Sequence, residues 1–226
     1  MEYSDRKTER FASLFPRYLF LPPNAKILVV GCGTGEEAAI LLQVLGGEVI
    51  GIDMNDRFNP DLAKVPHLVL MKQEATVLPW QEGTFHLVYS YHTLEHIPEY
   101  PRVLTEMSRV LIQGGGAVIG TPNRTRIIGY LGSKPGTTWK HKIVYNLIDW
   151  KHKLQGRFQN KYGAHAGFSA TELKAAIRMH FPHVKNITRD YYHAVYPRKK
   201  TLINALFACR LDHALFPSVY FIGLKE

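Results

Sequence analysis

The stretch KILVVGCGTGE at residues 26–36 decides the fold. Residues 26–30 form an apolar run, which is typical of a strand buried on both faces of a parallel sheet. The glycines that follow it, Gly31, Gly33 and Gly35, predict a turn that leads from the strand into a helix. Apolar residues then recur at helical spacing over residues 36–45, and two glycines after them predict the end of this helix.

The same alternation of strands and helices continues along the chain. After a helix expected to reach about Leu111 and a capping box formed by Ser169 and Glu172, the last part again predicts a helix and strands. Strands that alternate with helices predict an α/β fold with a seven-stranded, mostly parallel sheet and helices on both faces. The six strands expected besides the first are residues 49–52, 67–71, 85–90, 117–120, 184–188 and 218–224.

The glycine turn and the end of the second strand predict a ligand site. Glycines between a strand and a helix let the backbone approach a ligand closely. A dinucleotide fingerprint requires a glycine or alanine where this chain has Glu36, so the turn favours a ligand without a pyrophosphate and disfavours an NAD enzyme. Asp53 ends the second strand, 18 residues after Gly35, where a carboxylate suits the two hydroxyls of a ribose.

These motifs resemble those of class I S-adenosylmethionine (SAM)-dependent methyltransferases, in particular the small-molecule branch that includes ubiquinone-type O-methyltransferases. The resemblance covers about residues 25–123 and implies a Rossmann-like class I methyltransferase fold with SAM as the cofactor. It is specific for fold and cofactor and poor for the substrate. The motifs that carry it are residues 29–35, 51–53, 73–80, 85–88, 94–97, 106–111, 114–116 and 121–123.

Carried over residue by residue, the resemblance implies a set of SAM contacts. The glycines would hold the methionine and ribose parts, Asp53 the ribose hydroxyls, and Met54 the adenine ring. Glu74 would accept from the adenine amino group, although an ordinary exposed acid is the alternative for Glu74 and a plain core residue the alternative for Met54. The full set is Gly31, Cys32, Gly33, Gly35, Asp53, Met54, Glu74, Ala75, Ser90 and Tyr91.

His92 and His96 are the candidate catalytic residues. A methyl acceptor that is a hydroxyl must lose a proton, and a histidine suits that role near neutral pH. With Glu95 they have i, i+3, i+4 spacing, which predicts one helical face. The resembling O-methyltransferases have Glu-x-x-Glu-His here and associate it with a divalent metal. A metal held by this set and a purely structural role stay open as alternatives, and no metal ligand is assigned.

The positive charge of the chain is concentrated in one segment. The sequence has 28 Lys and Arg against 19 Asp and Glu, a net charge of +9, and residues 124–165 hold nine of the cations with Asp149 as their one acid. In the resembling family this region covers the substrate, so we expect a basic substrate lid that also carries aromatic residues such as Tyr130. The segment has three alternative partners: a small or lipophilic acceptor, RNA, or an anionic membrane surface. A further alternative is that it is only a solvated cationic face without a partner.

The remaining features concern organisation and location. Two cysteines, Cys32 and Cys209, exclude a disulfide scaffold. No apolar run is long enough to span a bilayer and the N-terminus lacks an apolar signal core, so a cytoplasmic protein is expected. Residues 1–226 are expected to form one methyltransferase domain with an insertion at about 124–165. The expected activity is methyl transfer, most readily to oxygen; an RNA methyltransferase and a non-catalytic SAM-binding partner protein are the rival hypotheses.

Overall fold

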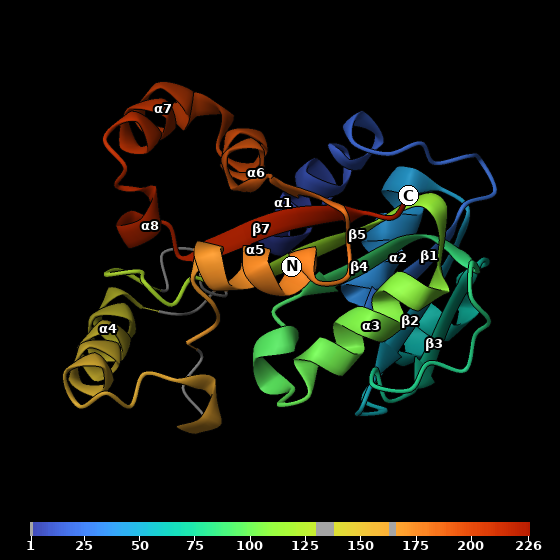
Figure 1. Ribbon diagram of the computed structural model, residues 1–226, viewed down its shortest axis with the longest axis horizontal. Coiled ribbons are helices and arrows are strands. Elements are labelled where there is room, and N and C mark those ends of the chain that lie inside the picture. Colours follow the sequence, from blue (N-terminus) through green and yellow to red (C-terminus); the bar gives the residue numbers. More distant parts are fainter. Residues whose placement is uncertain (1, 130–137, 163–165) are drawn as a thin grey trace.

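A seven-stranded sheet forms the centre of the molecule (Figure 1). The computed structural model describes residues 2–129, 138–162 and 166–226. The strand order is β3-β2-β1-β4-β5-β7-β6, and β7 runs antiparallel to both of its neighbours while the first five strands are parallel. The predicted seven-stranded, mostly parallel sheet is therefore confirmed. Its strands are β1 (Lys26–Val30), β2 (Glu48–Asp53), β3 (Leu68–Lys72), β4 (Phe85–Tyr91), β5 (Leu111–Pro122), β6 (His183–Asn186) and β7 (Ser218–Leu224).

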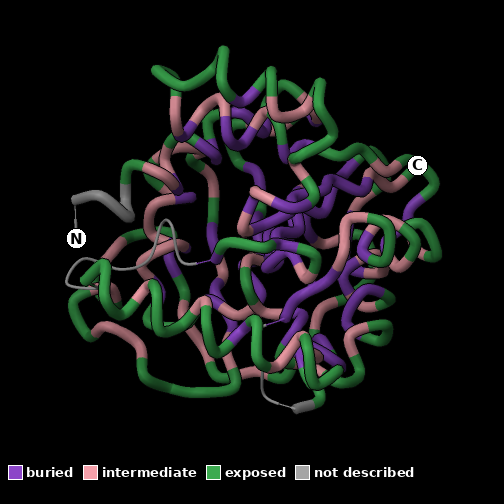
Figure 2. Tube along the Cα trace, turned by 90° about the vertical axis from the view of Figure 1, so that its left-hand side faces the viewer, coloured by how far each residue is buried: buried purple, intermediate pink, exposed green. Residues whose placement is uncertain are grey.

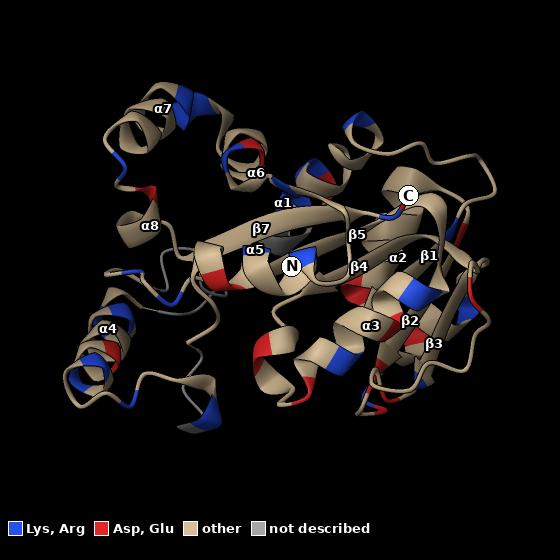
Figure 3. Ribbon diagram, in the orientation of Figure 1, with Lys and Arg blue, Asp and Glu red and all other residues tan. Residues whose placement is uncertain are grey.

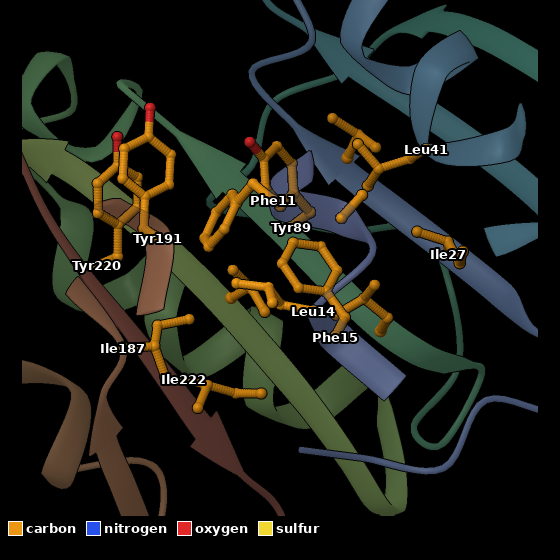
Figure 4. Packing of buried hydrophobic residues seen from close by; sticks show 14 of the residues in the cluster. Phe11, Leu14, Phe15, Ile27, Leu41, Tyr89, Ile187, Tyr191, Tyr220 and Ile222 are labelled. Atoms are coloured by element: carbon orange, nitrogen blue, oxygen red, sulfur yellow. The ribbon is translucent and has the colours of Figure 1, made fainter. Parts of the chain in front are cut away.

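Helices cover both faces of the sheet, as predicted. One core lies between the sheet and the helices α1, α2 and α6, where Phe11, Leu41 and Tyr191 pack together (Figure 4). The other lies under α3 and α5, which contribute Met107 and Ile177. The helices are α1 (Glu2–Ala12), α2 (Glu36–Leu45), α3 (Tyr100–Val110), α4 (Trp139–Leu154), α5 (Ala170–Arg178), α6 (Thr188–Val195), α7 (Lys200–Ala208) and α8 (Asp212–Leu215).

Two predicted boundaries are wrong for local reasons. The helix expected directly after the fourth strand begins only at Tyr100, because His92 takes a left-handed conformation (φ 51°) and a short 3₁₀ turn, Leu94–His96, follows it. Thr188, expected in the sixth strand, is instead the first residue of α6. The N–H of Thr188 donates a hydrogen bond to the side chain of Asn186, which ends the strand there. The capping box of Ser169 and Glu172 is present at the start of α5, as predicted.

The basic segment forms α4 and a 3₁₀ turn, Asn160–Tyr162, beyond the end of β5 (Figure 1). Tyr130 and Lys134, which the sequence also placed in this segment, lie outside the described residues. A helix long and apolar enough to cross a bilayer does not occur in the part of the chain that the structure describes. The division into one domain with an insertion stays a prediction.

Candidate active site

The glycine turn after β1 is shaped by backbone geometry that favours glycine. Gly31 and Gly33 have φ of +75° and +56°, in the left-handed region. The N–H groups of Gly31 and Cys32 donate to the carbonyl of Ile52 at 2.8 and 2.9 Å, which draws the turn across the end of β2. A Cβ on Gly31 would lie 2.1 Å from Oγ1 of Thr93, so the chain that leaves β4 packs directly on this glycine.

A hydrogen bond joins the glycine turn to the acid after the second strand. The N–H of Gly33 donates to Oδ2 of Asp53 at 2.9 Å, and the N–H of Asn55 donates to Oδ1 at 2.9 Å. The side-chain amide of Asn55 also donates to Oδ1, at 3.4 Å. A carboxylate has about four lone-pair positions, so Asp53 keeps acceptor capacity for one further donor, such as a ribose hydroxyl. The sequence predicted both partners from their places at neighbouring strand ends, but not the bond between them.

A pocket of about 840 Å³ opens over this turn and is of the size that small-molecule ligands occupy. Eight of the residues singled out in the sequence line it, together with Asn55, Thr93 and Ile97, which the sequence did not single out. Their positions follow from the fold, because the carboxyl ends of parallel strands meet at one edge of the sheet. The eight are Gly31, Gly33, Asp53, Met54, Glu74, Ala75, His92 and His96.

Two residues of the predicted SAM set lie beneath the turn and do not line this pocket. The Cys32 side chain is buried in the core against Gly51, and burial, followed by the charge of Asp53, raises the pKa of its thiol to about 12. Gly35 caps α2 with φ +94°, and a Cβ there would lie 2.3 Å from Cδ1 of Leu70. Both positions therefore shape the turn from below.

Two further members of that set also lie outside the pocket lining. Ser90 is 1% exposed, and its buried Oγ has no hydrogen-bond partner among the described residues. Tyr91 points to the other face of β4, where its ring packs 4.1 Å from the His92 ring and stacks on Tyr220 at 6.0 Å, measured between ring centroids. Burial raises the pKa of the Tyr91 hydroxyl well above its ordinary value.

His92, Glu95 and His96 do not share a helical face, contrary to the sequence prediction. His92 lies before the 3₁₀ turn, and its Nε2 is 3.1 Å from Oγ of Ser218 on β7. Within the turn, the Glu95 side chain is 1% exposed whereas that of His96 is 51% exposed. Among residues 2–129, 138–162 and 166–226, no group of three His, Cys, Asp or Glu side chains has a geometry that could hold a metal ion.

Glu95 is the residue of this site whose environment is most unusual. Its two carboxylate oxygens are buried and accept no hydrogen bond from another described residue, and Oε1 lies 3.9 Å from Nε2 of His96. Burial raises the pKa of the Glu95 carboxyl to about 7, although the backbone N–H of Glu95 and then the positive charge of Arg126 act in the opposite direction. Buried carboxyls with raised pKa values are characteristic of functional sites. This burial could not be predicted from the sequence, because it depends on the 3₁₀ turn that replaces the expected helix.

A charged pair on α3 holds the loop that carries Glu74 and Ala75. The guanidinium of Arg109 donates to the carbonyls of Trp80 and Leu78 at 2.8 and 3.0 Å, while Oε2 of Glu106 accepts from the N–H of Leu78 at 2.8 Å. The hydrogen bond from Arg109 lowers the pKa of the Glu106 carboxyl. This pair fixes the loop at Leu78 and Trp80, neither of which lines the pocket.

Comparison with known proteins relates the part of the chain that carries this pocket to methyltransferases. Residues 28–119 match the family model described as "Methyltransferase domain". A demethylmenaquinone methyltransferase of Lysinibacillus sphaericus is 32% identical over 124 residues, which are 50% of this chain and 51% of that protein. A demethylmenaquinone methyltransferase of Bacillus cereus is 28% identical over 122 residues. The chain therefore aligns with only about half the length of these relatives.

Solved structures share the fold at low sequence identity. Phosphoethanolamine N-methyltransferase 2 of Haemonchus contortus in complex with SAM aligns with a TM-score of 0.60 and 14% identity, over 96% of this chain and 52% of that one. The [4+2]-cyclase SpnF aligns with a TM-score of 0.58 and 15% identity, over 96% and 81%. Because one neighbour is named as a cyclase, the fold by itself does not determine the reaction.

The pocket fits SAM on its own geometry. A glycine turn that brings the backbone close, a carboxylate tied to that turn with acceptor capacity to spare, and the exposed apolar side chain of Met54 match the ribose and adenine of this cofactor. Sheet order, site and family match agree with one another. Residues 28–119 thus match the methyltransferase-domain family and are built on the fold of class I SAM-dependent methyltransferases.

Proposed function

We propose that this protein transfers a methyl group from SAM to a small or lipophilic acceptor. The observation that carries the proposal is the hydrogen bond between the Gly33 N–H and Asp53 Oδ2 inside a pocket of about 840 Å³. When bound, SAM supplies an activated methyl group on a positively charged sulfur. The task left to the protein is to bind, orient and, where needed, deprotonate the acceptor, and positioning alone can supply about 7–11 kcal/mol of a barrier.

Six residues of the pocket would hold the cofactor. Asp53 would accept from a ribose hydroxyl, and Gly31 and Gly33 would let the backbone lie against the ribose and methionine. Met54 would pack on the adenine, and Glu74 beside Ala75 would accept from the adenine amino group. Cys32, Gly35, Ser90 and Tyr91 act, in this proposal, only through the shape of the strand ends, because none of them lines the described pocket.

His96 is the proposed proton acceptor, and Glu95 its positioning residue. His96 lines the pocket and is half exposed, whereas His92 is held by Ser218 at 3.1 Å. A proton that leaves an acceptor hydroxyl would pass to a ring nitrogen of His96, and the imidazolium formed would face the Glu95 carboxylate, 3.9 Å away in the structure. His92 would then orient the acceptor through its ring. A general base contributes typically 10²–10⁴-fold to rate.

The acceptor is proposed as a lipophilic ring compound of the quinone type. The support is the name of the relatives, demethylmenaquinone methyltransferase. That name describes the relatives, and their alignments cover half of this chain. That name does not favour the oxygen that the sequence suggested over a ring carbon. We propose that the part of the basic segment around Arg126 covers the acceptor, because the positive charge of Arg126 acts on the carboxyl of Glu95 beside the pocket.

A transfer assay with methyl-labelled SAM tests the function. The acceptors are demethylated naphthoquinols, simple phenols and total RNA, and mass spectrometry of the product separates an O-methyl from a C-methyl group. Label in a quinol or phenol that His96→Ala reduces at least tenfold supports the proposal. Label in RNA alone would establish the rival RNA methyltransferase. SAM binding without transfer to any acceptor would leave a non-catalytic SAM-binding protein.

A further inference from the structure

The helix α4 exposes most of its apolar side chains to solvent. Leu154 is 91% exposed and Trp139 68%, and Asp149 is the helix's one buried residue in the described structure. Ile143, Leu147 and Leu154 lie at i, i+4 and i+11 and so follow one flank of the helix. We call the exposed side the α4 surface, and define it by Trp139, Ile143, Val144, Leu147, Ile148 and Leu154.

The polar side of α4 is the side that packs on the protein. Asp149 Oδ2 is 3.0 Å from a guanidinium nitrogen of Arg126, and both side chains are buried. The Asn146 amide accepts from the N–H of Gly129 at 2.7 Å and donates to the carbonyl of the same residue at 3.2 Å. A helix normally turns its apolar stripe to the core. The helix α4 is instead anchored by an ion pair and by hydrogen bonds of the Asn146 amide, so its apolar side chains remain available to another partner.

The charges near the α4 surface have one sign. Lys140 and Lys151 are exposed on the helix and Arg157 is exposed just after it (Figure 3). The acid of the helix, Asp149, is neutralised by Arg126 inside the protein. Figure 2 shows exposed residues in green at the outside of the molecule and buried residues in purple at its centre. The α4 surface is thus apolar and cationic together, without an exposed acid among the described residues of the helix.

We propose that the α4 surface docks on an anionic phospholipid bilayer. A helix with exposed aliphatic side chains and lysines lies in the plane of the interface, with its apolar side in the headgroup and acyl boundary. Lysine stems extend along the apolar surface while their ammonium groups reach the lipid phosphates. Trp139 at the first turn suits the interface, where tryptophan is enriched.

The same observations disfavour two other occupants. In a twofold dimer through α4 the same patch meets itself, so Lys140 and Lys151 would face further lysines with no acid to pair them. Single-stranded RNA is bound by stacking on aromatic rings. Five of the six side chains that define the surface are instead branched aliphatic, with no ring on which a base can stack: Ile143, Val144, Leu147, Ile148 and Leu154.

Vesicle binding without SAM or acceptor tests the proposal independently of the proposed reaction. Full-length protein is floated with vesicles of phosphatidylcholine that contain about 30% phosphatidylglycerol, and with phosphatidylcholine alone. The wild type is expected to bind the anionic vesicles. Ile143→Ser/Leu147→Ser should weaken this partitioning at least about tenfold. Lys140→Gln/Lys151→Gln should weaken it roughly 20- to 30-fold at low salt.

Matched variants control for exposure and for charge. Met179→Ser changes a side chain that is 80% exposed directly after α5, and Lys64→Gln/Lys72→Gln removes two exposed cations elsewhere; both are expected to bind like the wild type. Equal loss in these controls, or wild-type protein that does not float, would overturn the proposal. So would RNA binding or dimer formation that Ile143→Ser/Leu147→Ser abolishes while flotation persists. Unchanged SAM binding in the α4 variants separates this outcome from failure of the catalytic proposal.

Discussion

Replacing Glu95 by glutamine removes the one carboxyl of the candidate active site whose pKa is strongly displaced. Burial raises that pKa from 4.5 to about 7, so between these pH values the folded protein keeps a proton that the unfolded chain has released. Its contribution to stability is therefore lost as pH rises through this window and is constant above about pH 7. At 1.36 kcal/mol for each pKa unit, the loss reaches about 3 kcal/mol above pH 7.

Glutamine at this position does not titrate, so the variant should escape that loss. We expect Glu95→Gln and the wild type to have similar stability near pH 4.5, and the variant to be about 3 kcal/mol more stable at pH 8. Urea unfolding at half-unit steps from pH 4.5 to 8.5 gives the two curves. Parallel curves would refute the reasoning, because they would mean that the Glu95 carboxyl is ionised at its ordinary pKa in the folded protein.

Glu37 provides the matched control for this experiment. Burial also raises the pKa of its carboxyl to about 7, but it lies on α2, where it bonds to Thr8, and does not line the pocket. Glu37→Gln should therefore also flatten the pH dependence of stability and leave methyl transfer unchanged. Glu95→Gln should reduce transfer about tenfold or more, since His96 loses the carboxylate beside it. An equal effect of both variants on transfer would remove the role assigned to Glu95.

Three other outcomes follow from the site. Gly33→Ala should lower the free energy of unfolding by about 1–2 kcal/mol through its left-handed backbone alone, whereas Gly31→Ala should lower it more because the new methyl group also displaces Thr93. Urea unfolding measures both losses, and equal losses would contradict the packing of Thr93 on Gly31. Arg109→Lys should raise the Kd for SAM by freeing the loop at Leu78, as calorimetry would show. The pKa of Glu106 is lowered in the folded protein, so its pairing with Arg109 should stabilise the protein at pH values above the pKa that this carboxyl has in the unfolded chain. This stabilisation should be lost as the pH falls through the lowered pKa of the folded protein, and Glu106→Gln should not show that loss.

The parts of the fold that the sequence predicted are those set by continuous local patterns. The buried strand at residues 26–30 and the helix up to Leu45 have apolar runs and stop signals that need no knowledge of distant partners. The same is true of Asp53, because a strand end fixes which edge of the sheet it occupies. Six of the ten residues that the resemblance assigned to SAM line one pocket for this reason.

The features that the sequence did not predict depend on contacts between distant residues. His92 leaves the helical path in a left-handed conformation and its ring meets Ser218, 126 residues further along the chain. That turn buries Glu95, which helical spacing had placed beside two histidines. The exposure of the apolar side chains of α4 was not predicted either, because it depends on the buried pair of Arg126 and Asp149, which turns the polar side of the helix to the protein.

The most direct test of the account is calorimetric titration of the protein with SAM. The wild type should bind one SAM per chain, and Asp53→Ala should weaken binding at least about tenfold, because a hydrogen bond to a charged group contributes about 1.5–3 kcal/mol. Asp56→Ala, which removes an exposed carboxylate three residues away, should bind SAM like the wild type, with thermal unfolding confirming that both variants fold. Binding of equal affinity in Asp53→Ala and the wild type, or a wild type that does not bind SAM, would contradict the central claim.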